Sequence, residues 1–144
     1  MSVQLQVSYV IDRPLSKVFH FMATEHVRNH PRWDPDIELE QISDGPIGVG
    51  TMIRRRNSRS GTPVEGTMEI VEFEPNRAVG MVIHDGPVEM IGRATYEAES
   101  HDRIRLTVNV GIPSMDESMG SMLSSGIQQS LRNIKQLIES EVNE

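Results

Sequence analysis

The possible folds are limited most by one stretch near the C-terminus, SMGSMLSSGIQQSLRNI at residues 118–134. From there to Val142, apolar residues recur every three or four positions, a spacing typical of an amphipathic helix. Ser114 and Glu117 fit the S-x-x-E capping box, so we expect the helix to begin near residue 114. Such a helix would be long enough to cover a whole sheet.

Upstream of this helix, apolar and polar residues alternate with the period of a β-strand. Residues 3–11 predict a first strand, and residues 36–110 predict about six more strands joined by short turns, which makes them antiparallel neighbours. Between residues 14 and 30 the apolar spacing predicts one or two short helices, ended by Pro31 and Pro35. We therefore expect a single α+β domain over residues 1–144.

Composition and charge argue against several classes of function. The 144 residues include no cysteine, so thiolate metal sites and cysteine nucleophiles are excluded. No apolar run approaches the ~18 residues of a membrane span and no secretion signal is recognisable, so we expect a cytoplasmic protein without stable membrane insertion. The net charge of −7 disfavours nucleic-acid binding, and the basic run IRRRNSR at 53–59 is interpreted as a solvated strand face.

Several segments, taken in order, resemble a known family. They are VSYVIDRPLSKVFHFMATEHVRNHPRW at 7–33, DGPIGVGT at 44–51, EIVEFEPNRAVGM at 69–81, and the closing helix. Together they resemble the START-like (SRPBCC) superfamily, especially its polyketide cyclase/dehydrase branch. The resemblance implies a helix-grip fold, in which a curved antiparallel sheet of about seven strands wraps the long C-terminal helix and leaves a cavity. It also implies a lipid, quinone or polyketide-like ligand, because relatives bind such molecules and a minority catalyse cyclisation or dehydration.

The closing helix has two different halves. Ile127, Leu131, Ile134 and Ile138 form an apolar face that we expect to pack on the sheet, whereas the preceding half mixes methionine with serine and glycine. That half either leaves room for a ligand or fills a methionine-rich core. If a cavity is present, its predicted wall combines this helix with inward strand positions: Arg55, Met90, Tyr96, Met115, Met119, Met122 and Leu123.

Arg55, His84 and Tyr96 are weak candidates for acid–base catalysis, since no nucleophile motif identifies a catalytic residue. Alternation places Arg55 on the inward face with Ile53, where it would need a carboxylate partner or an anionic ligand. Its place in a charged run favours the other alternative, in which local twist turns Arg55 to solvent. His84 lies at a strand end and is more simply interpreted as a turn residue.

Other conspicuous residues are assigned structural roles. His26 and His30 are four residues apart, but no third ligand follows at a convincing spacing, so we predict a solvent-exposed pair and no metal site. The glycine-rich segment 44–51 lacks the Lys-Ser/Thr and the following helix of a phosphate loop. By the family resemblance, Trp33 is expected to pack against the end of the sheet.

Two hypotheses follow. The first is a protein that binds a small apolar or amphipathic molecule between the sheet and the C-terminal helix. The alternative is a polyketide cyclase or dehydratase-type enzyme that uses polar residues of the same cavity. Neither requires a cofactor. A small molecule is the expected partner, and the sequence leaves the oligomeric state open, a homodimer included.

Overall fold

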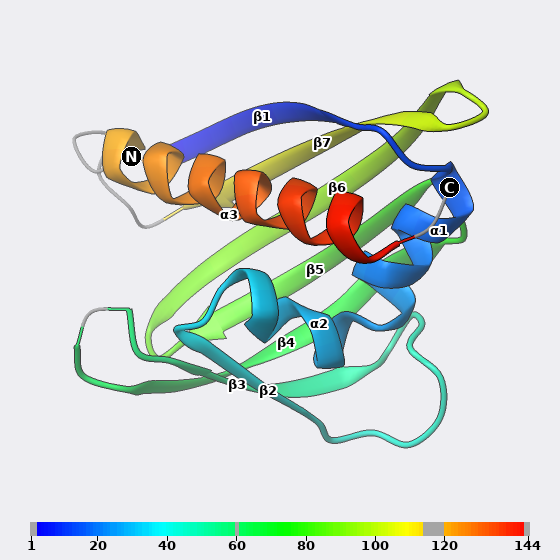
Figure 1. Ribbon diagram of the computed structural model, residues 1–144. Coiled ribbons are helices and arrows are strands. Elements are labelled where there is room, and N and C mark those ends of the chain that lie inside the picture. Colours follow the sequence, from blue (N-terminus) through cyan, green and yellow to red (C-terminus); the bar gives the residue numbers. More distant parts are fainter. Residues whose placement is uncertain (1–2, 60, 114–119, 143–144) are drawn as a thin grey trace.

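The computed structural model describes residues 3–59, 61–113 and 120–142, with the backbone alone described at residues 3, 120, 122 and 123. Its centre is a seven-stranded antiparallel sheet in the order β1-β7-β6-β5-β4-β3-β2, and a C-terminal helix crosses the sheet (Figure 1). The strands are β1 (Val3–Ile11), β2 (Ile37–Gln41), β3 (Met52–Asn57), β4 (Val64–Glu74), β5 (Ala78–Asp85), β6 (Val88–Ser100) and β7 (Arg103–Ile112). The helices are α1 (Leu15–Phe19), the π-helix η1 (His20–Thr24), α2 (His26–Trp33) and α3 (Gly120–Glu141).

The predicted helix-grip architecture is confirmed. From β2 to β7 every strand pairs with the next in sequence, and β1 closes the order by pairing with β7. The register shifts between Ile70 and Glu72 in β4, and again between Ala98 and Ser100 in β6. Such irregularities bend and twist strands, which lets the sheet curve around α3.

The short helices lie between β1 and β2, as predicted, but they extend further than residue 30. α2 continues through Pro31 to Trp33. Proline inside a helix removes one backbone hydrogen bond. The loss is tolerated here because Pro31 lies in the last turn and the buried Trp33 holds the end of the helix in the core.

The C-terminal half of α3 provides the predicted apolar face. Leu131, Ile134 and Ile138 are buried in the main hydrophobic core, and Ile127 packs against it half-buried. In the same core, Phe19 meets Phe73 and Tyr96 edge-on, with ring centroids 5.4 and 5.0 Å apart. The proposed capping box at 114–117 lies outside the described residues.

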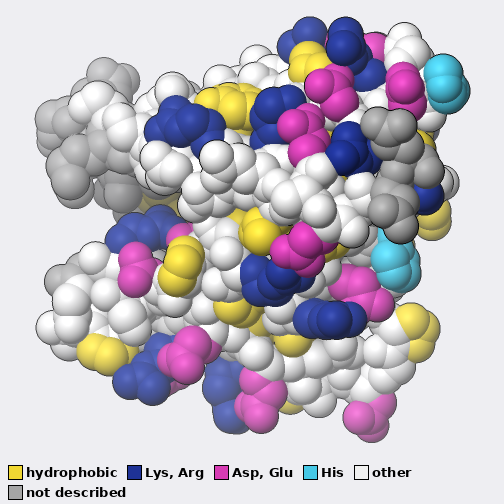
Figure 2. Space-filling model, in the orientation of Figure 1, with side chains coloured by type: hydrophobic (Ala, Val, Ile, Leu, Met, Phe, Trp, Pro, Cys, Tyr) yellow, Lys and Arg dark blue, Asp and Glu magenta, His cyan; other side chains and the backbone are white. Residues whose placement is uncertain are grey.

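The surface of the molecule carries both signs of charge. Figure 2 shows acidic and basic side chains interspersed over one face, with a recess below the N-terminal half of α3. Arg54 and Arg56 from the basic run are exposed and pair with glutamates on β2 and β4, as expected of a solvated strand face. Within the described ranges, no helix is long and apolar enough to cross a membrane.

Candidate ligand-binding site

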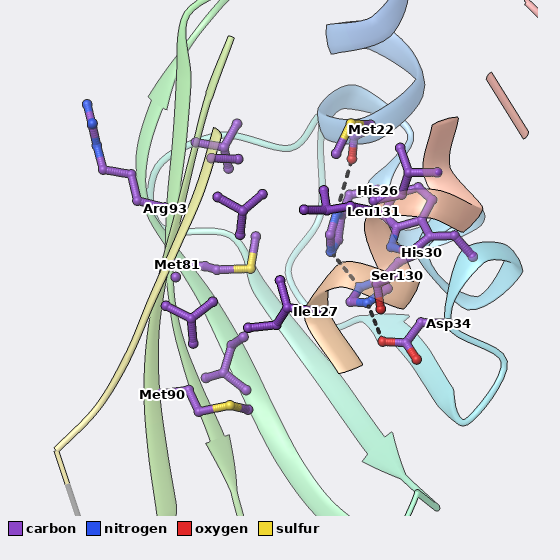
Figure 3. Close-up of a pocket in the computed structure, with 18 of the residues that line it drawn as sticks. Met22, His26, His30, Asp34, Met81, Met90, Arg93, Ile127, Ser130 and Leu131 are labelled. Atoms are coloured by element: carbon purple, nitrogen blue, oxygen red, sulfur yellow. Dashed lines mark hydrogen bonds and ion pairs between the residues drawn. The ribbon is translucent and has the colours of Figure 1, made fainter. Parts of the chain in front are cut away.

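A cavity of about 200 Å³ lies between the sheet and α3. β5, β6 and β7 form one wall, α3 forms the opposite wall, and the polar residues gather at the end next to α2 (Figure 3). Most of the lining is apolar and includes Val79, Met81, Ile83, Val108, Ile127 and Leu131. A smaller cavity of about 60 Å³ adjoins it and reaches Tyr96.

The inner face of β6 explains why this space is open. Met90, Gly92 and Ala94 line the larger cavity and Tyr96 the smaller one, so the predicted alternation of β6 is confirmed. Gly92 and Ala94 have small side chains or none, which leaves volume that larger residues would occupy. The Arg93 side chain points away from the cavity and pairs with Glu72 on the outer face (Figure 3).

Arg55 is buried, so the preference for a solvent-exposed arginine was wrong: its exposed fraction is 4%. Its register partner on β4 is Gly66, whose own partner on β5 is Asp85. The guanidinium thus passes over a residue without a side chain to reach a carboxylate two strands away. Nε donates to Oδ1 of Asp85 at 2.8 Å and Nη2 to Oδ2 at 3.2 Å, and Asn57 donates to Oδ2 at 3.0 Å.

The partner of the buried Arg55 is a carboxylate of the protein itself. An inward arginine requires a carboxylate or an anionic ligand, and Asp85 supplies the carboxylate from within the chain. Gly66 is required at this crossing, because a Cβ there would lie 1.6 Å from the backbone oxygen of His84. Arg55 therefore lines the cavity as part of an internally neutral pair.

The prediction of an exposed histidine pair was also wrong. His26 and His30 are largely buried on the cavity side of α2, and the His30 ring stacks on Trp33 at a centroid distance of 5.2 Å. Trp33 is itself buried in the hydrophobic core and also lines the cavity.

A chain of polar contacts runs through these two rings (Figure 3). Nδ1 of His26 is 3.0 Å from the Met22 carbonyl oxygen, and Nε2 of His26 is 3.0 Å from Nδ1 of His30. Nε2 of His30 then faces Oδ2 of Asp34 at 3.5 Å. Arg59 ends the chain, because its Nη2 donates to both carboxylate oxygens of Asp34 at 2.6 and 2.7 Å.

The protonation of the rings follows from their partners. A carbonyl oxygen only accepts hydrogen bonds, so Nδ1 of His26 carries its hydrogen. Burial lowers the pKa of His26 to about 3, so the ring is neutral near pH 7 and its Nε2 is an acceptor. His30 therefore donates from Nδ1. When His30 is neutral, the lone pair of its Nε2 points at Asp34.

The pKa values of His30 and Asp34 are each subject to effects of opposite sign. Burial lowers the pKa of His30, although the Asp34 carboxylate opposes that shift. Burial acts to raise the pKa of Asp34, but the pKa is lowered overall by the hydrogen bonds and charge of Arg59, together with the contribution that His30 makes when it is protonated. A neutral imidazole facing an ionised carboxylate is the resulting state near pH 7.

The other predicted site residues are dispersed. Tyr96 packs against Phe19 in the smaller cavity, where burial raises the pKa of its phenol. His84 is about half exposed near the end of β5 and lies 3.7 Å from Glu89. Met115 and Met119 lie outside the described residues, and Met122 and Leu123 are in α3 with only their backbone described. Among the described residues, no group of histidine and acidic side chains is arranged to hold a metal ion.

Residues on α2 and α3 were missed as site residues. Asp34, the C-cap residue of α2, and Ser130 on α3 line the polar end (Figure 3). Arg59, which follows β3, lines the same cavity. The spacing of His26, His30 and Asp34 was a usable signal, because residues four apart share one face of a helix.

Residues 2–139 match the family described as polyketide cyclase / dehydrase and lipid transport. A START superfamily protein from Mycobacterium smegmatis is similar in structure, with a TM-score of 0.79 and 10% identity over 95% of this chain and 97% of that one. The Zhui aromatase/cyclase from Streptomyces sp. R1128 gives a TM-score of 0.77 and 13% identity over 99% and 97%. Norcoclaurine synthase from Thalictrum flavum, in complex with dopamine and hydroxybenzaldehyde, gives 0.73 and 12% over 100% and 90%. No curated protein matches the chain in sequence.

Proposed function

The chain belongs to the polyketide cyclase / dehydrase and lipid transport family, and we propose that it binds a compact, mostly apolar molecule in the cavity between the sheet and α3. The observation that carries this proposal is the cavity itself, whose walls are apolar and whose charged groups lie at one end. Such a pocket favours the burial of an apolar body and orients it by a few polar contacts.

The volume favours a compact ligand. About 200 Å³ exceeds the ~150 Å³ cavity that accommodates a benzene molecule. It falls short of the roughly 300–1,000 Å³ of typical ligand pockets. A quinone or a small polyketide-like ring is therefore a better candidate than a long-chain lipid.

An acid–base enzyme built on Arg55, His84 and Tyr96 has weaker support. Arg55 and Tyr96 are buried, but Nε and Nη2 of Arg55 already donate to Asp85, and Tyr96 lines the smaller cavity. His84 lies on the exposed part of β5. These three side chains do not converge on one position where a substrate atom could react, as general acid–base catalysis requires.

Native mass spectrometry of the protein purified from its source organism tests the proposal directly. We expect a bound molecule that denaturing extraction releases. The variant Ala94→Leu should abolish this occupancy, because Ala94 lines both cavities. The matched control Ile91→Phe also enlarges a side chain on β6, at an exposed outer position, and should retain the ligand.

The two variants separate cavity binding from adventitious association. Loss of the bound molecule in Ala94→Leu alone would support the cavity as its site. Equal occupancy in Ala94→Leu and the native protein would refute the proposed site. A protein that carries no molecule from its source and binds no apolar probe in vitro would refute the function itself.

A further inference from the structure

The three polar contacts at the end of the cavity next to α2 have one hydrogen fewer than they need to become three hydrogen bonds. Three contacts connect the Met22 carbonyl, His26, His30 and Asp34, and each needs one hydrogen to become a hydrogen bond. Two neutral imidazoles supply only two. The two contacts of 3.0 Å have their hydrogens, whereas the 3.5 Å contact between His30 Nε2 and Asp34 Oδ2 places two acceptors face to face.

No other described side chain donates a hydrogen bond to Nε2 of His30. Arg59 is on the far side of the carboxylate and bonds to Asp34. Arg55 directs Nε and Nη2 to Asp85. The lone pair of His30 and one oxygen of Asp34 are thus available to a group that enters from the cavity, which both residues line.

The charges at this end decide what kind of donor fits. Arg55 is balanced by Asp85 and Arg59 by Asp34, so the four charged groups sum to zero. A buried cation or anion would add an uncompensated charge, which is costly in a poorly solvated site. A neutral hydroxyl donates one hydrogen and adds no charge.

We propose that His30 and Asp34 together accept a hydrogen bond from a hydroxyl of the ligand, and that the ligand class is compact apolar rings that carry a phenol or enol hydroxyl. This inference rests on the ligand-binding function proposed above and adds the polar group that the cavity selects. A phenol or enol suits the site because its hydroxyl is a strong donor attached directly to a flat apolar body.

The test compares 2-naphthol with 2-methylnaphthalene by equilibrium dialysis near pH 7. The two probes have similar shape, but a methyl group replaces the hydroxyl, so burial of apolar surface alone favours 2-methylnaphthalene. A hydrogen bond to a charged acceptor reverses this order, and we expect 2-naphthol to bind roughly tenfold or more tightly.

Two variants locate the contact. In Asp34→Asn the new amide can donate to Nε2 of His30 and fill the gap from within the protein, so the preference for 2-naphthol should vanish while 2-methylnaphthalene still binds. Asp36→Asn is the matched control: it makes the same change at an exposed carboxylate that is not among the residues lining the cavity, and the preference should survive. Binding of 2-methylnaphthalene shows in each case that the variant is folded.

The outcomes distinguish this inference from the function on which it rests. If the native protein binds 2-methylnaphthalene at least as tightly as 2-naphthol, the hydroxyl contact is wrong and the apolar cavity stands. A preference that persists in Asp34→Asn, or disappears in Asp36→Asn, also overturns the assignment to His30 and Asp34. If neither probe binds, both the inference and the proposed function fail.

Discussion

Removal of Asp85 should destabilise the protein strongly, because it leaves a buried guanidinium without its carboxylate. Arg55 is 4% exposed and Asp85 is 9% exposed, and two hydrogen bonds of 2.8 and 3.2 Å join them. Breaking one partner of such a buried pair costs about 3–5 kcal/mol. For a chain of 144 residues this corresponds to a fall in Tm of roughly 10–16 °C.

Urea unfolding of a double-mutant cycle measures this coupling. Asp85→Leu should lose about 3–5 kcal/mol, while the double variant with Arg55→Met should recover most of the loss, because both charges are then absent. Arg54→Met is the matched control, since Arg54 pairs with Glu40 in solvent and should contribute less than about 1 kcal/mol. A double variant as unstable as Asp85→Leu would show that the loss does not come from an unpaired Arg55.

Two further predictions concern the strands and the buried histidines. Gly66→Ala should destabilise the protein in urea unfolding, because the new Cβ would lie 1.6 Å from a backbone oxygen. Gly92→Ala should be tolerated, because its Cβ would come no closer than 3.8 Å to Met81. Equal losses of stability in the two variants would contradict the packing described. His26 should also make the free energy of unfolding fall as the pH is lowered, by about 1.4 kcal/mol per pH unit between about pH 6 and 4. In this range the ring takes up a proton in the unfolded chain, where its pKa is the ordinary 6.5, but not in the folded protein, where its pKa is about 3. Urea unfolding across this range should give a shallower slope for His26→Gln, and an unchanged slope would refute the buried neutral ring.

The fold was predictable because its signals are periodic and local. Alternation in β6 identified the inward positions of Met90, Gly92 and Ala94, and the 3.6-residue period identified the buried face of α3. Both depend only on neighbouring residues in one element. The helix-grip architecture follows once seven strands and one long amphipathic helix must cover each other's apolar faces.

The site was less predictable because its contacts depend on register across strands. Alternation placed Arg55 inward, yet the surrounding charges suggested solvent, and the partner that resolves the conflict is 30 residues away. Finding Asp85 requires the pairing of β3 with β4 and of β4 with β5, together with the absence of a side chain at Gly66. Local sequence patterns contain none of this information.

The buried histidines were missed for a different reason. Their spacing showed that they share a face, but not whether that face meets the core or the solvent. The π-helix η1 precedes α2 and accommodates extra residues per turn, so the apolar phase of residues 15–22 does not carry over to α2. The face of α2 that meets the cavity is therefore set by the tertiary structure.

The lone pair on Nε2 of His30 connects ligand recognition with the response to acid. Protonation of His30 would place a hydrogen in its gap with Asp34 and complete the chain, so a proton and a ligand hydroxyl compete for one position. Burial and the charges of Arg55 and Arg59 disfavour the imidazolium, whereas Asp34 favours it, and Asp85 offsets the charge of Arg55. Burial of His30 thus has a functional consequence, because it keeps the acceptor unprotonated near pH 7 and available to a neutral donor.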